Sequence, residues 1–377
     1  MSDEMSSDCA GTTISAAAPG DRGRLTRRTA IAALAASLAP APLLARPTMS
    51  AAAMFRRRFV LALPMTSPVV QDAIGRPLYP SFFAVNGRGR EVFILYGFDQ
   101  RPGDSGAIFC VFDLDTGEIK TWFYGTQRWR EALIFREHSG QRWLYSLGTQ
   151  YPIRYDITEL PKMGSYVSPQ KIYNKAPRSY SQMAWTGADF VYMKGGGQKR
   201  EFIVTDPEFN PISEFSFPLS CVGIYSKDEA QLAYPKTQGI AWFRERFVMG
   251  SGRAYVLGSR APRGNAALPG NQQGILSCDS GGKLIGAALC NPDIALGLMG
   301  GMIGRKIRVI ENEGISAAND GRLYAIWQVQ HPDSFASEGR KWGIIITEEV
   351  SSGPDAVDFS KGAFELLVND KDRSLDR

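Results

Sequence analysis

The sequence is poor in the residues and motifs on which many enzymes depend. It has two histidines, His138 and His331, in 377 residues, which leaves little material for a Ser-His-Asp hydrolase or a multi-histidine metal site. No GxSxG, HExxH or P-loop pattern is present, and the glycines at 195–197 lie between predicted strands without a following helix, so we interpret them as a turn. The sequence therefore predicts no cofactor and no metal ion, and it indicates no specific catalytic residue.

Cysteine is also scarce, and the charge is nearly balanced. The cysteines are too widely spaced for a zinc or haem signature. They are Cys9, Cys110, Cys221, Cys278 and Cys290. We expect free, buried thiols, and a bridge between Cys221 and Cys290 stays open because both lie in loops predicted on one face. A net charge of +5 is mild, so nothing indicates a nucleic-acid-binding protein, while acidic partners are allowed.

Long apolar runs are missing, and the one moderate run lies near the N-terminus. Arg27-Arg28 precedes an Ala-rich apolar segment at 31–39, and small residues follow to position 45. This order predicts a secretory signal over residues 1–45 that is similar to twin-arginine signals, although the usual Phe-Leu-Lys is missing. A membrane anchor and a fortuitous Ala-rich helix are the alternatives, but the run is too short and too weakly apolar for a stable transmembrane anchor. We therefore expect a periplasmic or secreted protein.

Glycine and proline, in contrast, are plentiful, with 39 and 22 residues. This composition is typical of short strands joined by tight turns. A polar residue followed by small or apolar residues opens a predicted strand five times, at spacings of 50, 50, 57 and 75 residues. The openings are Ser81-Phe82-Phe83-Ala84, Glu131-Ala132-Leu133-Ile134, Ser181-Gln182-Met183-Ala184, Gln238-Gly239-Ile240-Ala241 and Glu313-Gly314-Ile315-Ser316. The repeat predicts an all-β fold: a single β-propeller of five four-stranded blades over 59–370, with a linker at 46–58 and a tail at 371–377.

Several segments of the predicted propeller carry separate expectations. The fourth blade has a long insertion, Arg253–Asn271, which function or disorder should explain. Phe59–Leu63 is expected to pair beside the last blade and close the ring. The fourth strands of blades two and five are predicted at Val167–Tyr173 and Phe364–Val368. Predicted third strands end in aspartates that we interpret as turn formers rather than metal ligands. These are Asp113, Asp156, Asp206 and Asp279.

The first strand of each propeller blade lines the central channel, so the opening residues are predicted to project toward the axis. They would form a polar ring that could bind a cation, a sugar or ordered water, or would simply give a hydrated channel its polarity. The ring consists of Ser81, Glu131, Ser181, Gln238 and Glu313.

The long loops are predicted to share one face, where bases outnumber acids by roughly two to one. Arginine forks a carboxylate or phosphate, and aromatic rings stack on sugars, so this face suits an anionic or carbohydrate ligand. A solvated surface of mixed charge is the alternative. The ligand-binding candidates among the loop residues are Arg128, Arg130, Tyr151, Arg178, Arg253 and Tyr255.

Three short segments, Lys236–Ala241, Gly250–Gly252 and Glu311–Ile315, resemble the five-bladed propellers of TagC-like teichoic-acid proteins and staphylococcal phage receptor-binding proteins. The resemblance implies a module that recognises a surface polymer, although the Tat-like signal departs from that family. The Glu-Gly pair is also similar to one in calcium-dependent lactonases, whose Glu binds metal, but we place none of that family's remaining Asn and Asp ligands in this sequence.

Together these features predict an exported propeller that binds an acidic glycan or another surface polymer. The alternative is a propeller enzyme, either a polysaccharide lyase or hydrolase or a metal-dependent lactonase, with Glu131 and Glu313 acting at the channel mouth.

Overall fold

The chain divides into two compact units, Met1–Leu44 and Ala45–Arg377. The computed structural model describes residues 54–64, 70, 79–97, 107–125, 132–148, 152–171, 182–194, 199–218, 237–260, 262–266, 271–278, 284–304, 306–330, 341–351 and 366–367, all in the second unit. The predicted export signal therefore lies outside the described residues. No helix in the described ranges has the length and apolarity needed to cross a membrane.

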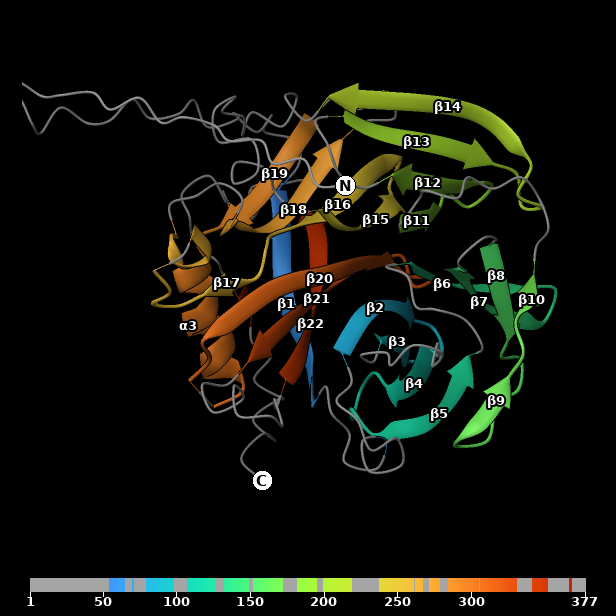
Figure 1. The fold of residues 1–377 in the computed structure, drawn as a ribbon, viewed down its shortest axis with the longest axis horizontal. Helices are drawn as coiled ribbons and strands as arrows, with labels where there is room; N and C mark the ends of the chain where they lie inside the picture. Colours follow the sequence, from blue (N-terminus) through green and yellow to red (C-terminus); the bar gives the residue numbers. More distant parts are fainter. Residues whose placement is uncertain are drawn as a thin grey trace, which may run out of the picture. The chain divides into compact units, whose positions relative to one another are not determined.

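The described strands form five sheets, which we number in chain order (Figure 1). Sheet 1 has the strand order β2 (Tyr79–Asn86), β3 (Glu91–Gly97), β4 (Ala107–Asp113), β5 (Ile119–Gly125) and β9 (Ser165–Val167). Sheet 2 has the order β10 (Gln170–Lys171), β8 (Pro152–Asp156), β7 (Gln141–Leu147) and β6 (Leu133–His138). Sheet 3 has the order β11 (Gln182–Trp185), β12 (Phe190–Lys194), β13 (Lys199–Thr205) and β14 (Pro211–Pro218).

Sheet 4 has the order β15 (Thr237–Phe243), β16 (Arg246–Ser251), β18 (Gln273–Cys278) and β19 (Leu284–Cys290). Sheet 5 has the order β17 (Tyr255–Val256), β20 (Val309–Ala317), β21 (Leu323–Gln330), β22 (Lys341–Ser351), β1 (Met54–Pro64) and β23 (Leu366–Leu367). Most neighbouring strands are antiparallel and joined by short turns, as the repeat in the sequence predicted. The prediction of a nearly all-β fold is confirmed.

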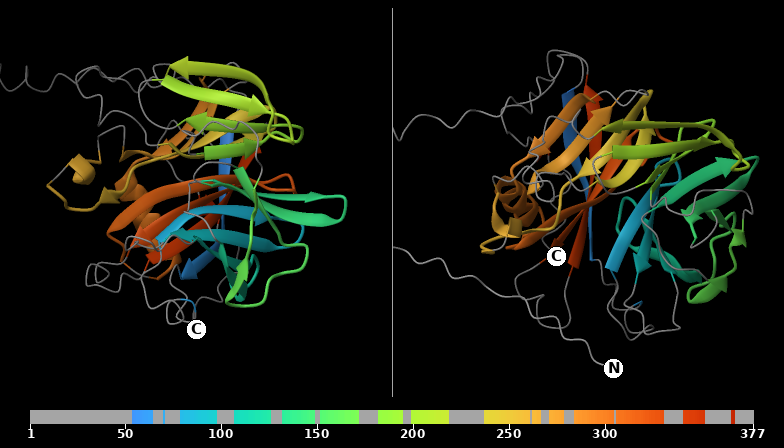
Figure 2. Two further views of the ribbon diagram at one scale, coloured as in Figure 1. Left: turned by 45° about the vertical axis from the view of Figure 1, so that its right-hand side comes forward. Right: turned by 45° about the horizontal axis from the view of Figure 1, so that its top comes forward.

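The sheets follow one another in a closed circuit. Strands β2, β6, β11, β15 and β20 contact one another in chain order, and β20 also contacts β2. The two views of Figure 2 show the same succession of sheets within the second unit. Because each sheet packs against the next and the last returns to the first, the second unit has a propeller-like fold.

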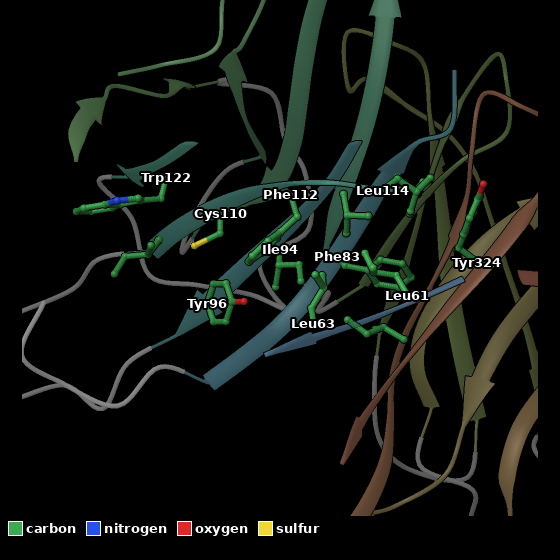
Figure 3. Close-up of a cluster of buried hydrophobic side chains, with 14 of the residues drawn as sticks. Leu61, Leu63, Phe83, Ile94, Tyr96, Cys110, Phe112, Leu114, Trp122 and Tyr324 are labelled. Atoms are coloured by element: carbon green, nitrogen blue, oxygen red, sulfur yellow. The ribbon is translucent and has the colours of Figure 1, made fainter. Parts of the chain in front are cut away.

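Apolar side chains fill the spaces between successive sheets. The cluster between sheets 5 and 1 is drawn in Figure 3, where Leu61 and Leu63 from β1 and Tyr324 from β21 lie beside Phe83 and Ile94 of sheet 1. Separate clusters join sheets 1 and 2, sheets 2 and 3, sheets 3 and 4, and sheets 4 and 5. Burial of these faces supplies the main driving force for the assembly of the sheets.

Strand β1 confirms that an N-terminal strand pairs beside the last sheet. It pairs antiparallel with β22 from Met54 opposite Ser351 to Pro64 opposite Trp342. The strand starts at Met54, inside the segment predicted as a linker at 46–58. The prediction that Phe364–Val368 is the fourth strand of the last blade is wrong, because β1 takes that position and Leu366–Leu367 pairs parallel outside it.

The segment predicted as the fourth strand of blade two is divided between two sheets. Gln170–Lys171 pairs with β8 as predicted, but Val167 belongs to β9, which joins sheet 1 in parallel with β5. Two hydrogen bonds hold the crossing chain: Thr121 Oγ1 donates to the Pro161 carbonyl at 2.6 Å, and the Gly164 amide donates to the Trp122 carbonyl at 2.9 Å. Such tertiary contacts cannot be inferred from strand pattern alone.

Part of the insertion after β16 pairs with the last sheet. Its strand β17 pairs with the start of β20, and a short 3-10 helix, η2 (Pro262–Gly264), follows. Helix α3 (Pro292–Met302), which the sequence analysis did not predict, covers the same region (Figure 2). Asn291 caps it by accepting from the Asp293 amide, and its buried residues Ala295 and Met299 belong to a cluster with Tyr255 and Trp327.

The turn role predicted for the aspartates is confirmed at three positions. Asp113 Oδ1 accepts from the amides of Asp115 and Thr116. Asp156 and Asp206 accept in the same manner from residues further along their turns. Asp279 and Cys221 lie outside the described residues, while Cys110 is a buried free thiol.

Candidate functional site

The three segments that carry the sequence resemblance meet where the start of β15, the end of β16 and the middle of β20 lie beside the start of β18. Four polar residues join them there, Gln238, Gln273, Glu311 and Asn312, and we call this group the amide network. Gln238 Nε2 donates to Glu311 Oε1 at 3.0 Å, which links sheet 4 to sheet 5. The predicted Gln-Gly and Glu-Gly openings are therefore neighbours in space.

Asn312 and Gln273 form the centre of this network. The Asn312 amide N–H donates to Gln273 Oε1 at 3.0 Å, and Asn312 Nδ2 donates to the Gly274 carbonyl at 2.8 Å. Gln273 Nε2 in turn donates to the carbonyls of Arg253 and Asn271 at 2.8 and 3.0 Å. Because these bonds reach both ends of the insertion, the network fixes where the insertion leaves sheet 4 and where it returns.

Inner strands β2, β15 and β20 have an irregular register at their predicted opening residues. Ser81 is the unpaired residue between Pro80 and Phe82, which pair with β3. In β15, Gln238 and Gly239 together lie opposite the single residue Gly250 of β16. In β20, Glu313 is the unpaired residue between Asn312 and Gly314. A bulge bends a strand and redirects its side chains. Three of the five polar openings recognised in the sequence, those of β2, β15 and β20, thus mark register shifts that were not predicted.

Glycine is required at these bulges because the inner strands approach closely. Gly239 has φ +81°, and a Cβ placed on it would lie 2.7 Å from Cε2 and Cζ of Phe82. A Cβ on Gly314 would lie 3.2 Å from the same ring, and one on Gly250 would lie 2.3 Å from the Gln238 carbonyl oxygen. The Phe82 ring therefore packs on the backbones of β15 and β20, where the sequence analysis expected a hydrated channel.

Burial separates the residues that position the site from those that reach its surface. Gln238 is 2% exposed, and Gln273 and Asn312 are fully buried. Ser251, also fully buried, has a hydroxyl without a hydrogen-bond partner among the described residues. Glu311, Glu313 and Arg253 are half-buried, so part of each residue is accessible at the surface beside the network.

The insertion adds positive charge beside the amide network. Arg253 is half-buried, and Arg260 and Arg263 are exposed. Burial lowers the pKa of Arg253, and the positive charge of Arg263 lowers it further. The two guanidinium groups are thus close enough for their charges to interact, and an anion beside them would be attracted by both.

The structure describes only part of the predicted site. It places Gln238 beside Glu311, whereas Glu313 lies at the bulge one residue beyond Asn312. Tyr255 is 1% exposed and donates a hydrogen bond from its hydroxyl to Asp293, so we leave it out of the proposed ligand surface. The side chain of Ser81 and all of the following residues lie outside the description: Arg128, Arg130, Glu131, Tyr151, Arg178 and Ser181.

Sequence reasoning missed Gln273, Glu311 and Asn312. Glu311 and Asn312 stand directly before the Glu-Gly pair in the sequence, which is a signal that could have found them. Gln273 follows the insertion and has no local signature. In the described ranges, no group of three or more His, Cys, Asp or Glu side chains is arranged to hold a metal ion.

The chain matches no protein-family model and no curated protein sequence. Solved structures similar to it include the tail fiber of Staphylococcus aureus phage P68, with 9% identity and a TM-score of 0.47 over 78% of this chain and 52% of that chain. CoXyl43, a GH43 β-xylosidase/α-arabinofuranosidase from a compost microbial metagenome, has 10% identity and a TM-score of 0.44, over 80% of this chain and 97% of that chain.

Glutaminyl cyclase of Myxococcus xanthus has 8% identity and a TM-score of 0.42, over 80% of this chain and 100% of that chain. At these identities and scores the likenesses carry no functional argument. The resemblance to TagC-like proteins gains no support from them and stays a prediction.

Proposed function

We propose that this protein is an exported, propeller-like module that binds an acidic glycan at the amide network. The observation that carries the proposal is the convergence of Gln238, Glu311 and Asn312 from two sheets beside an insertion that bears arginines. Its five sheets serve as the five blades in this proposal, and residues 1–45 serve as the export signal.

The chemistry of the partly exposed groups fits an acidic sugar. Glu311 and Glu313 carry oxygens that accept hydrogen bonds from sugar hydroxyls. Arg253 and Arg263 offer guanidinium groups, which bind a carboxylate or phosphate through paired N–H donors. One ligand with both hydroxyl and acidic groups would use both sets of side chains.

The buried part of the site supports binding by holding these groups in place. Gln238 fixes Glu311, and Gln273 fixes the Arg253 carbonyl at 2.8 Å. A site whose side chains are already oriented loses less conformational entropy when the ligand binds.

The test uses affinity electrophoresis of the mature protein in gels that contain alginate, polygalacturonate, purified wall teichoic acid or neutral dextran. We expect retardation in at least one anionic gel and none in dextran. The double variant Arg253→Ala/Arg263→Ala should raise the Kd for the retained polymer at least tenfold, which corresponds to a loss of about 1.4 kcal/mol of binding free energy. Size analysis of each polymer after incubation reports cleavage and so tests the enzymatic alternative.

Arg88→Ala/Arg322→Ala is the matched control, because both are exposed arginines in turns away from the insertion, Arg88 between β2 and β3 and Arg322 between β20 and β21. It also removes two positive charges and should leave binding unchanged. Equal weakening by this control and by Arg253→Ala/Arg263→Ala would show that only net charge matters, and absence of retardation in every anionic gel would overturn the proposal.

A further inference from the structure

A group of aromatic side chains lies on the outer edge of sheet 1. Strand β9 brings Tyr166 opposite Tyr124 of β5, and their rings stack with centroids 4.7 Å apart and planes 18° apart. Trp122 meets Tyr124 edge-on at 5.3 Å and 74°. We call Trp122, Tyr124 and Tyr166 the aromatic ledge.

The base of the ledge is fixed. Trp122 is 7% exposed, and a Cβ on Gly164 would lie 3.3 Å from its ring. The Gly164 amide donates to the Trp122 carbonyl at 2.9 Å, so the chain that carries Tyr166 is tied to the strand that carries Trp122. Tyr166 is therefore presented on a supported ring and does not extend from a free loop.

The top of the ledge is open. Tyr166 is 74% exposed, the highest value among the large hydrophobic side chains found exposed in the described ranges. The others are Met163, Ile212, Leu257 and Ile294, which have no aromatic ring. One face of the Tyr166 ring packs on Tyr124, which leaves its opposite face for a ligand.

We propose that the aromatic ledge is a stacking site for a sugar ring of a polysaccharide chain, separate from the amide network. A flat, rigid ring offers apolar area at little entropic cost, and its hydroxyl at the edge can bond to a polar partner. The C–H face of a pyranose matches this combination. The proposal rests on the proposed function only for the class of ligand, since the residues are different.

Two contacts on one polymer would also explain why a peripheral stacking site is useful. A polysaccharide held at the amide network raises the local concentration of its remaining sugar units near the protein surface. A weak contact at Tyr166 can then add to retention on an extended polymer without contributing to the binding of a short oligosaccharide.

The experiment is a sedimentation assay of the mature protein with insoluble chitin, cellulose and peptidoglycan sacculi. We expect the wild type to sediment with at least one polymer and Tyr166→Ala to lower its partition coefficient at least fivefold. Tyr166→Phe keeps the ring and should stay within twofold of the wild type. Ile212→Ala removes an exposed apolar side chain, 59% exposed, from a different sheet and should have no effect.

The outcomes separate the two proposals. Loss of sedimentation in Tyr166→Ala with normal electrophoretic retardation supports the ledge as an independent site. Loss in Arg253→Ala/Arg263→Ala alone, with Tyr166→Ala equal to the wild type, overturns the ledge and leaves the proposed function standing. A wild-type protein that sediments with none of the three polymers also overturns the ledge. Circular dichroism of each variant verifies that it is folded.

Discussion

Two polar networks connect neighbouring sheets, and they differ in what surrounds them. The hairpin network consists of Asn86, Glu91, Arg142 and Asn319. Asn86 Nδ2 donates to Glu91 Oε2 at 2.8 Å, Arg142 pairs with Glu91, and Asn319 Nδ2 donates to Asn86 Oδ1 at 2.8 Å. It therefore joins sheets 1, 2 and 5 next to short turns.

The amide network also joins sheets, but it lies where a long insertion leaves and returns. Its described hydrogen bonds join amides, backbone groups and one carboxylate, whereas the hairpin network contains an ion pair between side chains that are 22% and 7% exposed. The two networks therefore differ in their structural role. One set holds neighbouring hairpins together, and the other positions half-buried charged groups beside a basic insertion.

The strongest way to disrupt the amide network is to add a side chain at its bulge. Gly239→Ala should lower the free energy of unfolding by about 3–4 kcal/mol, because it combines an unfavourable positive φ with overpacking against Phe82. Gly321→Ala is the matched control, since Gly321 has φ +78° with no atom within 4 Å of its Cβ position, and it should cost about 1 kcal/mol. Urea unfolding measures both, and equal losses would show that Phe82 does not restrict Gly239.

The close approach at Gly239 shows how far the sequence could predict this molecule. The repeat of polar openings predicted the order of the strands, and it identified Gln238 and Glu313 as candidate site residues. It did so because a propeller-like fold repeats one local pattern, and local patterns are visible in a sequence. Pairing of β1 with the last sheet was also predictable, because an extra apolar strand needs a partner for its edge.

The contacts between sheets could not be predicted in the same way. Gln273 hydrogen-bonds to Asn312, 39 positions away in the sequence. Phe82 of sheet 1 packs against Gly239 of sheet 4, which is far from it in the sequence. Helix α3 was missed because its apolar residues face a cluster built by β17, β20 and β21 and show no strong amphipathic signal of their own. Register slips at bulges depend on such packing, so the sequence marked their positions without showing their geometry.

The hairpin network is best tested at its ion pair. Arg142→Met leaves Glu91 buried without its charged partner and should lower the free energy of unfolding by about 2–3 kcal/mol, near the lower end for broken buried pairs because Arg142 is partly exposed. Glycan binding should stay unchanged in the folded variant, in contrast to the arginine variants of the insertion.

Arg90→Met is the control for this ion pair. Arg90 pairs with Asp115 through side chains that are 37% and 57% exposed, so its loss should cost less than about 1 kcal/mol. Chemical denaturation of both variants gives the comparison. If Arg142→Met weakened glycan binding as much as Arg253→Ala/Arg263→Ala, the division between a holding network and a ligand-positioning network would be wrong.

Among the main variants the smallest expected effect concerns Asp113, whose side chain accepts hydrogen bonds within its own turn and pairs with Lys120. Amide hydrogen bonds from Thr116 and Asp115, with help from Lys120, lower the pKa of Asp113 to about 2 against burial. A carboxyl whose folded pKa is depressed contributes stability above its ordinary pKa near 3.8 and loses it as the pH falls toward 2. Asp113→Asn should cost about 1 kcal/mol at pH 7 and should flatten the fall in unfolding free energy between pH 4 and pH 2. If the unfolding free energy of the variant fell as steeply between pH 4 and pH 2 as that of the wild type, other carboxylates would account for the pH dependence. Asp113 would then contribute to its turn alone.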